Sequence, residues 1–331
     1  MKPKLLIVEL WGLGDLIIAT PIIRAAAERY DVTLLAKPFA LDLRPRLWPG
    51  VNVVPFVAPW TAFKGKYRLW QWHWPQILRL GREFETGHFE WGLSARWDPR
   101  DHLILKLIGV KNRLGFPRAG STILLSHPLA KPDPEAHRYE YWRTGARALG
   151  LDLPQREKIP ISTPRNPQTV LIHSGAGQTI RVWPLVNYRG LAARLREQGF
   201  AVQIACDPEQ RDWWLRSGES GVATPPNVAD LIALTDHAGV FIGNDSGPGH
   251  LAAFCGVPTF TIFGPQVAEW FVPLHPWAEW MDGKVCPYMP CSDYCRYPVP
   301  FCIRNITEME VWPRVEKFVH THCKTEAVNV R

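Results

Sequence analysis

The stretch "GNDSGPGHLAAFCGVPTFTIFGP", residues 243–265, contains five glycines and three prolines between two apolar runs. The run "GVFIG" (239–243) leads into it, and the run "PTFTIF" (258–263) follows a short predicted helix, "GHLAAFC". A strand, a helix and a second strand in this order predict a βαβ unit, in which the two strands are parallel. Glycines in the first connection let the backbone approach an anion closely, and the start of the helix favours phosphate. The stretch therefore predicts a parallel α/β fold with an anion-binding loop.

Units of the same kind are predicted in both halves of the chain. In the first half, "KLLIVEL" (4–10) and "VTLLA" (32–36) are predicted strands, and the helix between them is expected to begin at Thr20. In the second half, "TVLIH" (169–173) and "AVQIA" (201–205) are predicted strands on either side of an amphipathic helix. We therefore expect doubly wound parallel sheets, with ligands bound at the carboxyl ends of the strands.

The chain has 331 residues, which is long enough for two domains. The segment "PQREKIPISTPRNPQ" (154–168) is rich in proline and poor in apolar residues, and it predicts a linker. We expect an N-terminal Rossmann-like domain over residues 1–156 and a C-terminal one over residues 157–331, with a ligand cleft between them. Residues 40–100 are rich in proline, tryptophan and basic residues, and we expect irregular structure there.

The formal net charge is +7, from 38 Lys and Arg against 31 Asp and Glu. This excess favours anionic partners, but it does not choose among phosphorylated ligands, acidic membranes and nucleic acid. No apolar run is long enough to span a membrane. The apolar stretch at the N-terminus is short and is interrupted by Glu9 and Asp15, unlike a signal peptide. We therefore expect a cytoplasmic protein.

Two loops at predicted strand ends carry residues suited to binding phosphate. In "HSGAGQTIRVWP" (173–184), small residues let backbone amides face an anion, and Arg181 can bind it through two N–H groups. In the stretch that begins at residue 243, Ser246 and His250 can donate to the same ligand. Asp245 can accept from a hydroxyl group or orient a neighbour, or it can simply cap the helix.

A third loop, "GLGD" (12–15), follows the first predicted strand and ends in a carboxylate. A dinucleotide fingerprint would need a further glycine at position 17, where the chain has isoleucine. Asp15 at this strand end can take a proton from an acceptor hydroxyl group. The alternative is that Asp15 caps the following helix.

The stretches "GLGDLIIATPIIRAA", "HSGAGQTIRVWP" and "GNDSGPGHLAAFCGVPTFTIFGP", in this order and at these separations, resemble glycosyltransferase family 9. "GVKNRLGF" (109–116) and "HRYEYWRTGARALGL" (137–151) are similar to the N-terminal half of that family, so the resemblance covers nearly the whole chain. The resemblance implies a GT-B architecture of two facing Rossmann-like domains and an inverting enzyme that needs no catalytic metal. The best-known members are ADP-heptose:lipopolysaccharide heptosyltransferases.

The resemblance also implies roles for single residues. Asp15 matches the family's proposed general base, and Arg181 falls where a basic residue, usually lysine, contacts the donor phosphates. Because a guanidinium is a planar fork and an ammonium a point charge, this change alters the geometry of the contact. Glu209 is a weaker match to a residue that contacts the donor ribose, and it reads equally well as a solvated carboxylate. The implied donor-binding set is His173, Ser174, Gly175, Arg181, Glu209, Asp245, Ser246, Gly247 and His250.

Residues 37–100 are expected to form the acceptor side. "YRLWQWHWPQILRL" (67–80) mixes aromatic and basic residues, which suits sugar stacking or contact with a bilayer surface, although tryptophan-rich stretches often serve only as core. An anionic glycolipid or glycan acceptor and a peripheral contact with the inner membrane are therefore expected partners. The basic residues expected to bind the acceptor are Lys64, Lys66, Arg68 and Arg100.

The segment "CPYMPCSDYCRYPVPFC" (286–302) contains four cysteines, which could hold structural zinc or iron tetrahedrally. Their spacing is not the paired Cys-x-x-Cys that makes a strong zinc motif, so free thiols or an oxidation-prone cluster stay open. The candidate ligands are Cys286, Cys291, Cys295 and Cys302.

Taken together, the residues and the resemblance predict an inverting glycosyltransferase that requires no cofactor for catalysis. The expected reaction moves heptose from ADP-heptose to a lipopolysaccharide core or another cell-envelope glycan. One alternative is a GT-B-like nucleotide-sugar epimerase, which would need no acceptor. The other is a nucleic-acid-binding protein, which the scattered placement of the basic residues disfavours.

Overall fold

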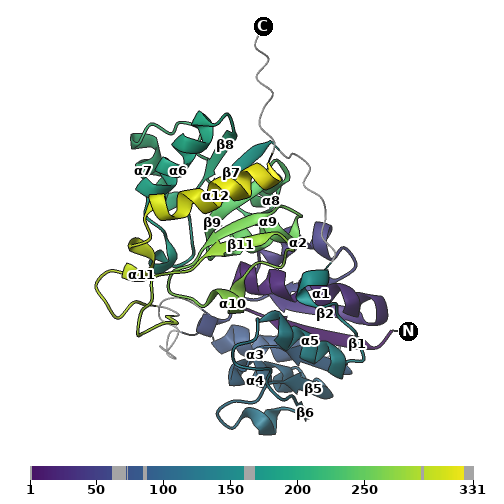
Figure 1. Cartoon of the computed structure of the whole chain (residues 1–331). Coiled ribbons are helices and arrows are strands. Elements are labelled where there is room, and N and C mark those ends of the chain that lie inside the picture. Colours follow the sequence, from purple (N-terminus) through teal and green to yellow (C-terminus); the bar gives the residue numbers. More distant parts are fainter. Residues whose placement is uncertain are drawn as a thin grey trace. The chain divides into compact units, whose positions relative to one another are not determined.

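The computed structural model describes residues 2–61, 72, 74–84, 88–159, 168–291 and 294–323. The chain forms two compact units, Met1–Pro154 and Gln155–Arg331, and each unit contains one parallel sheet (Figure 1). The predicted α/β class with two parallel sheets is therefore confirmed. Most of the expected linker, residues 160–167, lies outside the described residues.

The N-terminal sheet has the strand order β3-β2-β1-β4-β5-β6, and every neighbouring pair is parallel. The order reverses between β1 and β4, which is the switch point where open α/β sheets bind ligands. The strands are β1 (Lys4–Glu9), β2 (Asp31–Ala36), β3 (Asn52–Pro55), β4 (Trp91–Ser94), β5 (Asn112–Gly115) and β6 (His127–Pro128). The α-helices are α1 (Leu13–Arg29), α2 (Ala40–Leu47), α3 (Trp74–Glu83), α4 (Pro99–Leu107) and α5 (Tyr139–Ala148), with 3-10 turns at Pro59–Thr61 and Ser121–Leu124.

Both faces of the N-terminal sheet are covered by helices. Leu6 and Val8 of β1 belong to a buried cluster that includes Leu80 of α3 and residues of α4. The opposite face packs against α5, because a Cβ at Gly145 would lie only 2.9 Å from the side chain of Leu93 in β4. Since successive strand residues point to opposite faces, apolar residues run through β1 without alternating with polar ones.

The prediction that the first helix begins at Thr20 is wrong. Helix α1 begins at Leu13, with Gly12 as its N-cap, and the Gly12 N–H donates to Asp15 Oδ2 at 3.1 Å. Thr20 lies inside the helix, where its hydroxyl donates to the carbonyl of Leu16 at 3.3 Å, and Pro21 follows it. The buried residues of α1 pack along its whole length, and this tertiary packing outweighs the local Thr-Pro start signal.

The expectation of irregular structure over residues 40–100 is also wrong for the part that the structure describes. That region supplies α2, β3, α3 and β4 (Figure 1). Each of the two strands has only four residues, and each is held by parallel pairing with a central strand. Short strands of this kind give little periodic signal, so local patterning does not reveal them.

The C-terminal sheet has the strand order β11-β10-β9-β7-β8, and its pairs are likewise parallel. Its strands are β7 (Thr169–His173), β8 (Ala201–Ala205), β9 (Val240–Asn244), β10 (Thr259–Ile262) and β11 (Ala278–Met281). The α-helices are α6 (Leu185–Glu197), α7 (Arg211–Arg216), α8 (Val228–Asp236), α9 (Gly247–Phe254), α10 (Ala268–Phe271), α11 (Phe301–Arg304) and α12 (Glu308–His322), with 3-10 turns at Arg156–Lys158, Thr179–Arg181 and Pro208–Gln210.

The two faces of the C-terminal sheet have separate cores. Val170 and Ile172 of β7 pack in one buried cluster with residues of α6 and α12, and α12 runs across this face in Figure 1. Leu171 points to the other face, where it packs with Ala252 of α9. The predicted strands 169–173 and 201–205 are confirmed, as is the capping box between Thr307 and Glu310.

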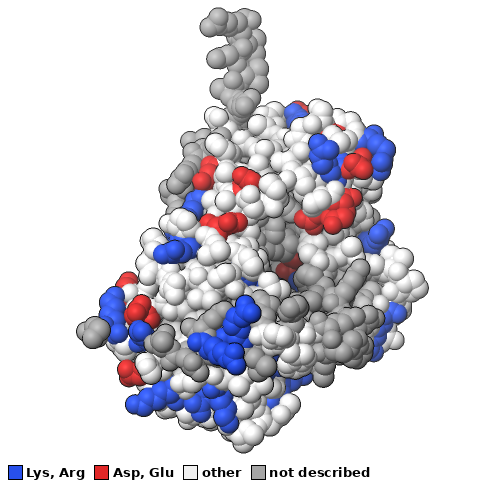
Figure 2. Space-filling model, turned by 180° about the vertical axis from the view of Figure 1, so that it is seen from behind, with Lys and Arg blue, Asp and Glu red and all other residues white. Residues whose placement is uncertain are grey.

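Among the described residues, no helix is both long and apolar enough to span a membrane. On the face drawn in Figure 2, the Lys and Arg side chains lie in several separate groups, with acidic and uncharged residues between them.

Asn244, the last residue of β9, joins the ends of two strands in the C-terminal unit. Its Nδ2 donates to the carbonyls of Ser174 at 2.8 Å and Gly175 at 3.2 Å. Its Oδ1 accepts from the N–H of Trp183 at 2.9 Å and from the hydroxyl of Tyr188 at 2.8 Å. The side chain is fully buried, so all four hydrogen bonds replace bonds to water.

We expect Asn244→Asp to destabilise the C-terminal unit by about 3–5 kcal/mol, because a carboxylate cannot donate to the two carbonyls and its second oxygen would be buried against them with no cation to pair with its charge. The measurement is the midpoint of urea unfolding. Asn227→Asp is the matched control, since Asn227 caps α8 and aspartate serves equally well at an N-cap. Equal midpoints for the two variants would contradict this account of Asn244.

Candidate functional site

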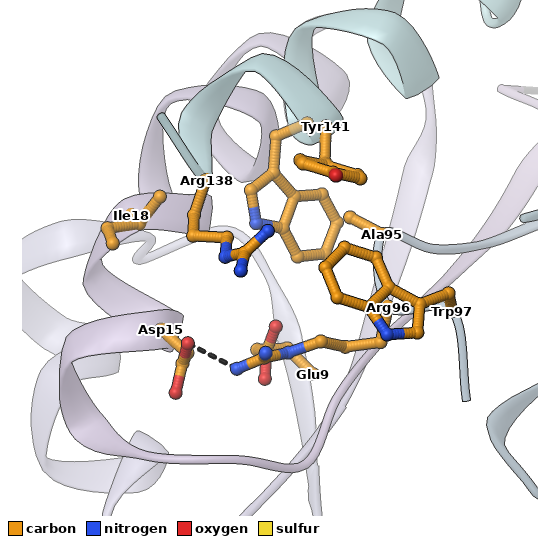
Figure 3. Close-up of a pocket in the computed structure, with 9 residues that line it drawn as sticks. Glu9, Asp15, Ile18, Ala95, Arg96, Trp97, Arg138 and Tyr141 are labelled. Carbon is orange, nitrogen blue, oxygen red and sulfur yellow. Dashed lines mark ion pairs between the residues drawn. The ribbon is translucent and has the colours of Figure 1, made fainter. Parts of the chain in front are cut away.

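Charged side chains from distant segments meet at the carboxyl edge of the N-terminal sheet. Glu9 ends β1, Lys37 follows β2, and Arg96 lies just after β4. A pocket at this edge has a cavity volume of about 20 Å³, enough for one water-sized group. Its lining is Glu9, Asp15, Ile18, Ala95, Arg96, Trp97, Arg138, Tyr141 and Trp142 (Figure 3).

Asp15 stands in the first turn of α1 and faces this pocket. Its Oδ1 forms an ion pair with Nη2 of Arg96, which Figure 3 marks, and its Oδ2 accepts from the Gly12 N–H. The predicted alternatives therefore coincide, because Asp15 both caps the helix and lines a pocket. Burial works to lower the pKa of Arg96, but the charges of Asp15 and Glu9 hold it above its usual value.

Glu9 is the buried acid of the pocket, with 2% of its surface exposed. Its Oε1 accepts from the N–H of Trp11 at 3.0 Å. Burial raises the pKa of Glu9 to about 8, the Arg96 guanidinium works against this rise, and the charge of Asp15 adds to it. Burial therefore favours the neutral form of Glu9, while the ion pair with Arg96 is made by Asp15.

A second cation, Arg138, enters the pocket from the residue before α5 (Figure 3). Its guanidinium lies 4.7 Å from the ring centre of Trp97 and 5.5 Å from that of Tyr141. Burial lowers the pKa of Arg138, and repulsion from Arg96 lowers it further. The pocket thus combines two guanidinium groups, two carboxyl groups and three aromatic side chains.

Arg100 is not part of the pocket lining. It lies in the first turn of α4, where Nε and Nη2 donate to the two oxygens of Asp98 at 2.8 and 2.6 Å. Its guanidinium also lies 5.6 Å from the ring centre of Trp60. The other predicted acceptor-binding residues, Lys64, Lys66 and Arg68, fall outside the described residues.

In the C-terminal unit, the structure brings Arg181 and Asp245 together. Nη1 of Arg181 lies 2.9 Å from Oδ2 of Asp245, and Nε donates to Oε1 of Gln178 at 3.1 Å. Asp245 follows β9, and Arg181 lies in the turn after β7. Asp245 is therefore paired with the cation of the neighbouring loop.

Helix α9 begins directly after Asp245. Ser246 is its N-cap, Gly247 is its first residue, and His250 is buried in its first turn. The first N–H groups of a helix have no acceptor within the helix, and the helix dipole is positive there. The hydroxyl of Ser246 makes no hydrogen bond although it is buried. These groups together form a site suited to an anion.

The loop after β7 is fixed by buried hydrogen bonds. The hydroxyl of Ser174 donates to Oε1 of Gln210 at 2.8 Å and accepts from Nε1–H of Trp214 at 3.0 Å. Nδ1 of His173 accepts from the N–H of Gly175 at 3.2 Å, and burial lowers the pKa of His173 against the opposing charge of Asp207. The polar side chains of His173 and Ser174 are thus engaged in holding the loop.

Gly175 allows the loop to pass next to the carboxylate of Asp207. A Cβ on Gly175 would lie 2.3–2.5 Å from that carboxylate group, so no larger residue fits without a shift. Glu209 lies two residues further on, in the turn Pro208–Gln210, and its side chain is exposed. Its placement fits the interpretation as a solvated carboxylate and leaves the expected ribose contact a prediction.

The four cysteines do not form the expected metal centre. Among the described residues, no group of three or more His, Cys, Asp or Glu side chains lies close enough to hold a metal ion. Cys291 and Cys302 point inward and are buried, whereas Cys286 and Cys295 are partly exposed. Burial raises the pKa of Cys302 to about 11, with a smaller contribution from the Cys286 thiol.

Sequence reasoning missed several residues that the structure places at these sites. Glu9 was recognised only as a break in an apolar run, although it occupies the end of a predicted strand. Arg96 follows β4, a strand that was not predicted, so its position at the sheet edge was hidden. The end of a predicted strand was the one available signal, and it would have identified Glu9 and Asn244.

Two units with parallel sheets, each with charged groups at its strand ends, define an α/β protein of the GT-B class. The model of glycosyltransferase family 9 (heptosyltransferase) matches residues 103–294, more than half of the chain, so the chain belongs to this family. The resemblance seen in the sequence is thereby confirmed.

Relatives and solved structures agree with this assignment. Lipopolysaccharide heptosyltransferase 1 of Pseudomonas aeruginosa is 31% identical over 133 residues, which are 36% of this chain and 37% of that protein. The chain thus spans little more than a third of the length of the curated relatives it matches. Glycosyl transferase family 9 from Veillonella parvula has a TM-score of 0.77 at 16% identity, covering 97% of this chain and 98% of that one. E. coli heptosyltransferase WaaC with ADP has a TM-score of 0.71 at 16% identity, covering 95% and 99%.

We expect Glu9→Gln to stabilise the protein at alkaline pH. Because the pKa of Glu9 is raised on folding, the folded protein binds more protons than the unfolded chain between about pH 4.5 and 8, and stability falls as pH rises through this window. Glutamine, which is never ionised, should remove this loss, worth up to about 5 kcal/mol above pH 8.

The measurement is urea unfolding of the Glu9→Gln variant and the wild-type protein at pH 5 and pH 9. The exposed Glu90, which precedes β4, provides the control Glu90→Gln. A Glu9→Gln variant that gains no stability relative to wild type between pH 5 and pH 9 would show that Glu9 titrates normally.

Proposed function

We propose that this protein is an inverting glycosyltransferase that moves a sugar, with heptose from ADP-heptose as the expected donor, to a lipopolysaccharide-core or other cell-envelope glycan. Membership of glycosyltransferase family 9 is the observation that carries the proposal. The N-terminal unit would bind the acceptor and the C-terminal unit the donor. The charged pocket at Asp15 and the anion site at α9 support this division.

The proposed chemistry assigns the donor diphosphate to the start of α9 and to Arg181. Negative charge grows on the diphosphate as the bond to the sugar carbon breaks, and the leaving oxygen keeps the electron pair. Backbone N–H groups, the helix dipole and a guanidinium can stabilise that charge without a metal ion. Ser246 contributes a buried hydroxyl that has no protein partner. His173, Ser174 and Gly175 hold the neighbouring loop in shape.

On the acceptor side, a hydroxyl oxygen attacks the sugar carbon from the face opposite the diphosphate, which inverts that carbon. The hydroxyl proton passes to Asp15 as the new bond forms. The cations Arg96 and Arg138 give this pocket a field that suits an anionic acceptor. Peripheral contact with a membrane surface would bring the protein to a glycolipid acceptor. Lys64, Lys66 and Arg68 stay predictions for binding of the acceptor.

The donor is tested by a thermal-shift panel of ADP-, GDP-, UDP- and dTDP-sugars, because a ligand that binds the folded state raises its melting temperature. ADP-heptose is expected to give the largest rise. Release of ADP should then depend on an added lipopolysaccharide-core acceptor. Conversion of the donor sugar without acceptor would instead indicate an epimerase.

We expect Asp15→Asn to lower kcat by about 100-fold or more, on the usual scale for loss of a general base, while ADP-heptose still binds. The measurements are acceptor-dependent ADP release and the donor-induced rise in melting temperature. Asp31→Asn is the control, since Asp31 is exposed at the amino end of β2, away from the pocket. Turnover by Asp15→Asn within a few-fold of wild type would exclude Asp15 as the base.

We expect Arg181→Gln to weaken ADP binding about 10- to 100-fold, because a charge-assisted contact to phosphate is lost, whereas Arg181→Lys keeps most of the affinity. Isothermal titration with ADP measures this effect. The exposed Arg189 on α6 provides the control Arg189→Gln. An Arg181→Gln variant that folds and binds ADP as tightly as this control would remove Arg181 from the donor site.

A further inference from the structure

We propose that Arg96 is a positioning residue shared between Asp15 and Glu9, and that the protonation of Glu9 decides whether Arg96 holds Asp15 in place to take a proton. This inference rests on the proposed function, because it assigns Asp15 the role of base. It assigns a role to Arg96, which follows β4, and to Glu9, which ends β1. Both residues act through Asp15 and do not contact the substrate.

The contacts of Arg96 fix where its charge lies. Its guanidinium stacks over the ring of Trp11 at 4.8 Å and forms the ion pair with Asp15. Glu9 lines the same pocket, and its carboxyl group overlaps the Arg96 guanidinium in the view of Figure 3. Glu9 and Asp15 therefore both act on the charge of Arg96 within one pocket, and the ion pair that the structure gives Arg96 there is the one with Asp15.

Asp15 is oriented by donors from two different elements. The Gly12 N–H holds one oxygen from within α1, and Arg96 holds the other from the loop after β4. A carboxylate oxygen has two lone-pair directions, so each oxygen can still accept the proton of a bound hydroxyl group. Loss of Arg96 would leave the carboxylate held at one oxygen only, and a base gains most of its effect from correct placement.

Glu9 controls how strongly Arg96 is drawn away from Asp15. A neutral Glu9 exerts no charge on the guanidinium, so Arg96 stays with Asp15. An ionised Glu9 adds a second negative charge within the same buried space, and Arg96 must then serve both groups. Burial of Glu9 raises its pKa to about 8, so this change falls just above neutral pH.

The other charged groups that face Glu9 come from three neighbouring elements. Asp15 projects from α1, Lys37 follows β2, and Asp101 belongs to α4. Asp101 accepts from Nε1–H of Trp60 at 3.3 Å and from the hydroxyl of Ser94 at 3.2 Å, and burial raises the pKa of Asp101 to about 7. Arg96 is the only one of these groups to which the structure gives a direct ion pair with Asp15.

The first experiment compares pH–rate profiles of sugar transfer for wild type, Glu9→Gln and the control Glu90→Gln. Wild type and control are expected to lose kcat as pH rises through about 8, and Glu9→Gln is expected to keep its kcat there. The fraction of folded protein is measured at each pH, because Glu9→Gln is also expected to remove a loss of stability there, and rates are compared per folded molecule. An alkaline limb that is unchanged in Glu9→Gln would overturn the proposal.

The second experiment removes the shared cation. Arg96→Gln is expected to lower kcat about tenfold at pH 7, with a smaller loss for Arg96→Lys, and to move the acidic limb to higher pH, because Asp15 no longer has a cation that favours its charged form. Arg118→Gln, at an exposed arginine, is the control. An Arg96→Gln profile that matches the control in height and shape would overturn the proposal.

A third measurement separates this inference from the proposed function. In a carboxyl ¹³C NMR titration of the unliganded protein, the Glu9 signal, assigned through Glu9→Gln, should titrate near pH 8 in wild type. It should titrate at lower pH in Asp15→Asn and at higher pH in Arg96→Gln. A Glu9 that titrates between pH 4 and 5 would overturn the inference even in an active transferase. Absence of transfer from any nucleotide-sugar, with these shifts intact, would reject only the proposed function.

Discussion

In a parallel sheet all strands end at the same edge, and both units of this chain place their functional groups along such an edge. In the N-terminal unit, β1, β2 and β4 deliver Glu9, Lys37 and Arg96 to one place from three distant segments. In the C-terminal unit, β7 and β9 deliver His173 and Asn244 in the same way. Because the strands pair in parallel, the residues at their carboxyl ends lie near one another at one edge of the sheet.

Charges gathered in this way need partners, because a buried charge without one is costly. In each unit an aspartate carboxylate is stabilised by an ion pair with an arginine from a different segment of the chain. Arg96 pairs with Asp15, and Arg181 pairs with Asp245. Glu9 has no such partner among the described residues, and its burial raises its pKa and so favours the neutral form.

Much of the fold could be predicted because its signals are local. Strands β7 and β8 are short, mostly apolar runs, Asn227 caps α8 through its own side chain, and Thr307 forms a capping box with Glu310. The elements that were missed depend on distant partners. Strand β4 has four residues and exists because it pairs with β1 and β5, and α1 extends back to Leu13 because its buried face packs along the sheet.

The sequence alone determined the family, the two parallel sheets and the loops that carry Asp15, Arg181 and Asp245, since each of these depends on residue order within a short stretch. Only the tertiary structure decided which charges meet. Three strands, β2, β3 and β4, lie between Asp15 and Arg96 along the chain, and the contact of the two side chains follows from the strand order β2-β1-β4. The physical reason is that a pairwise electrostatic contact depends on distance in space, and no local pattern encodes that distance.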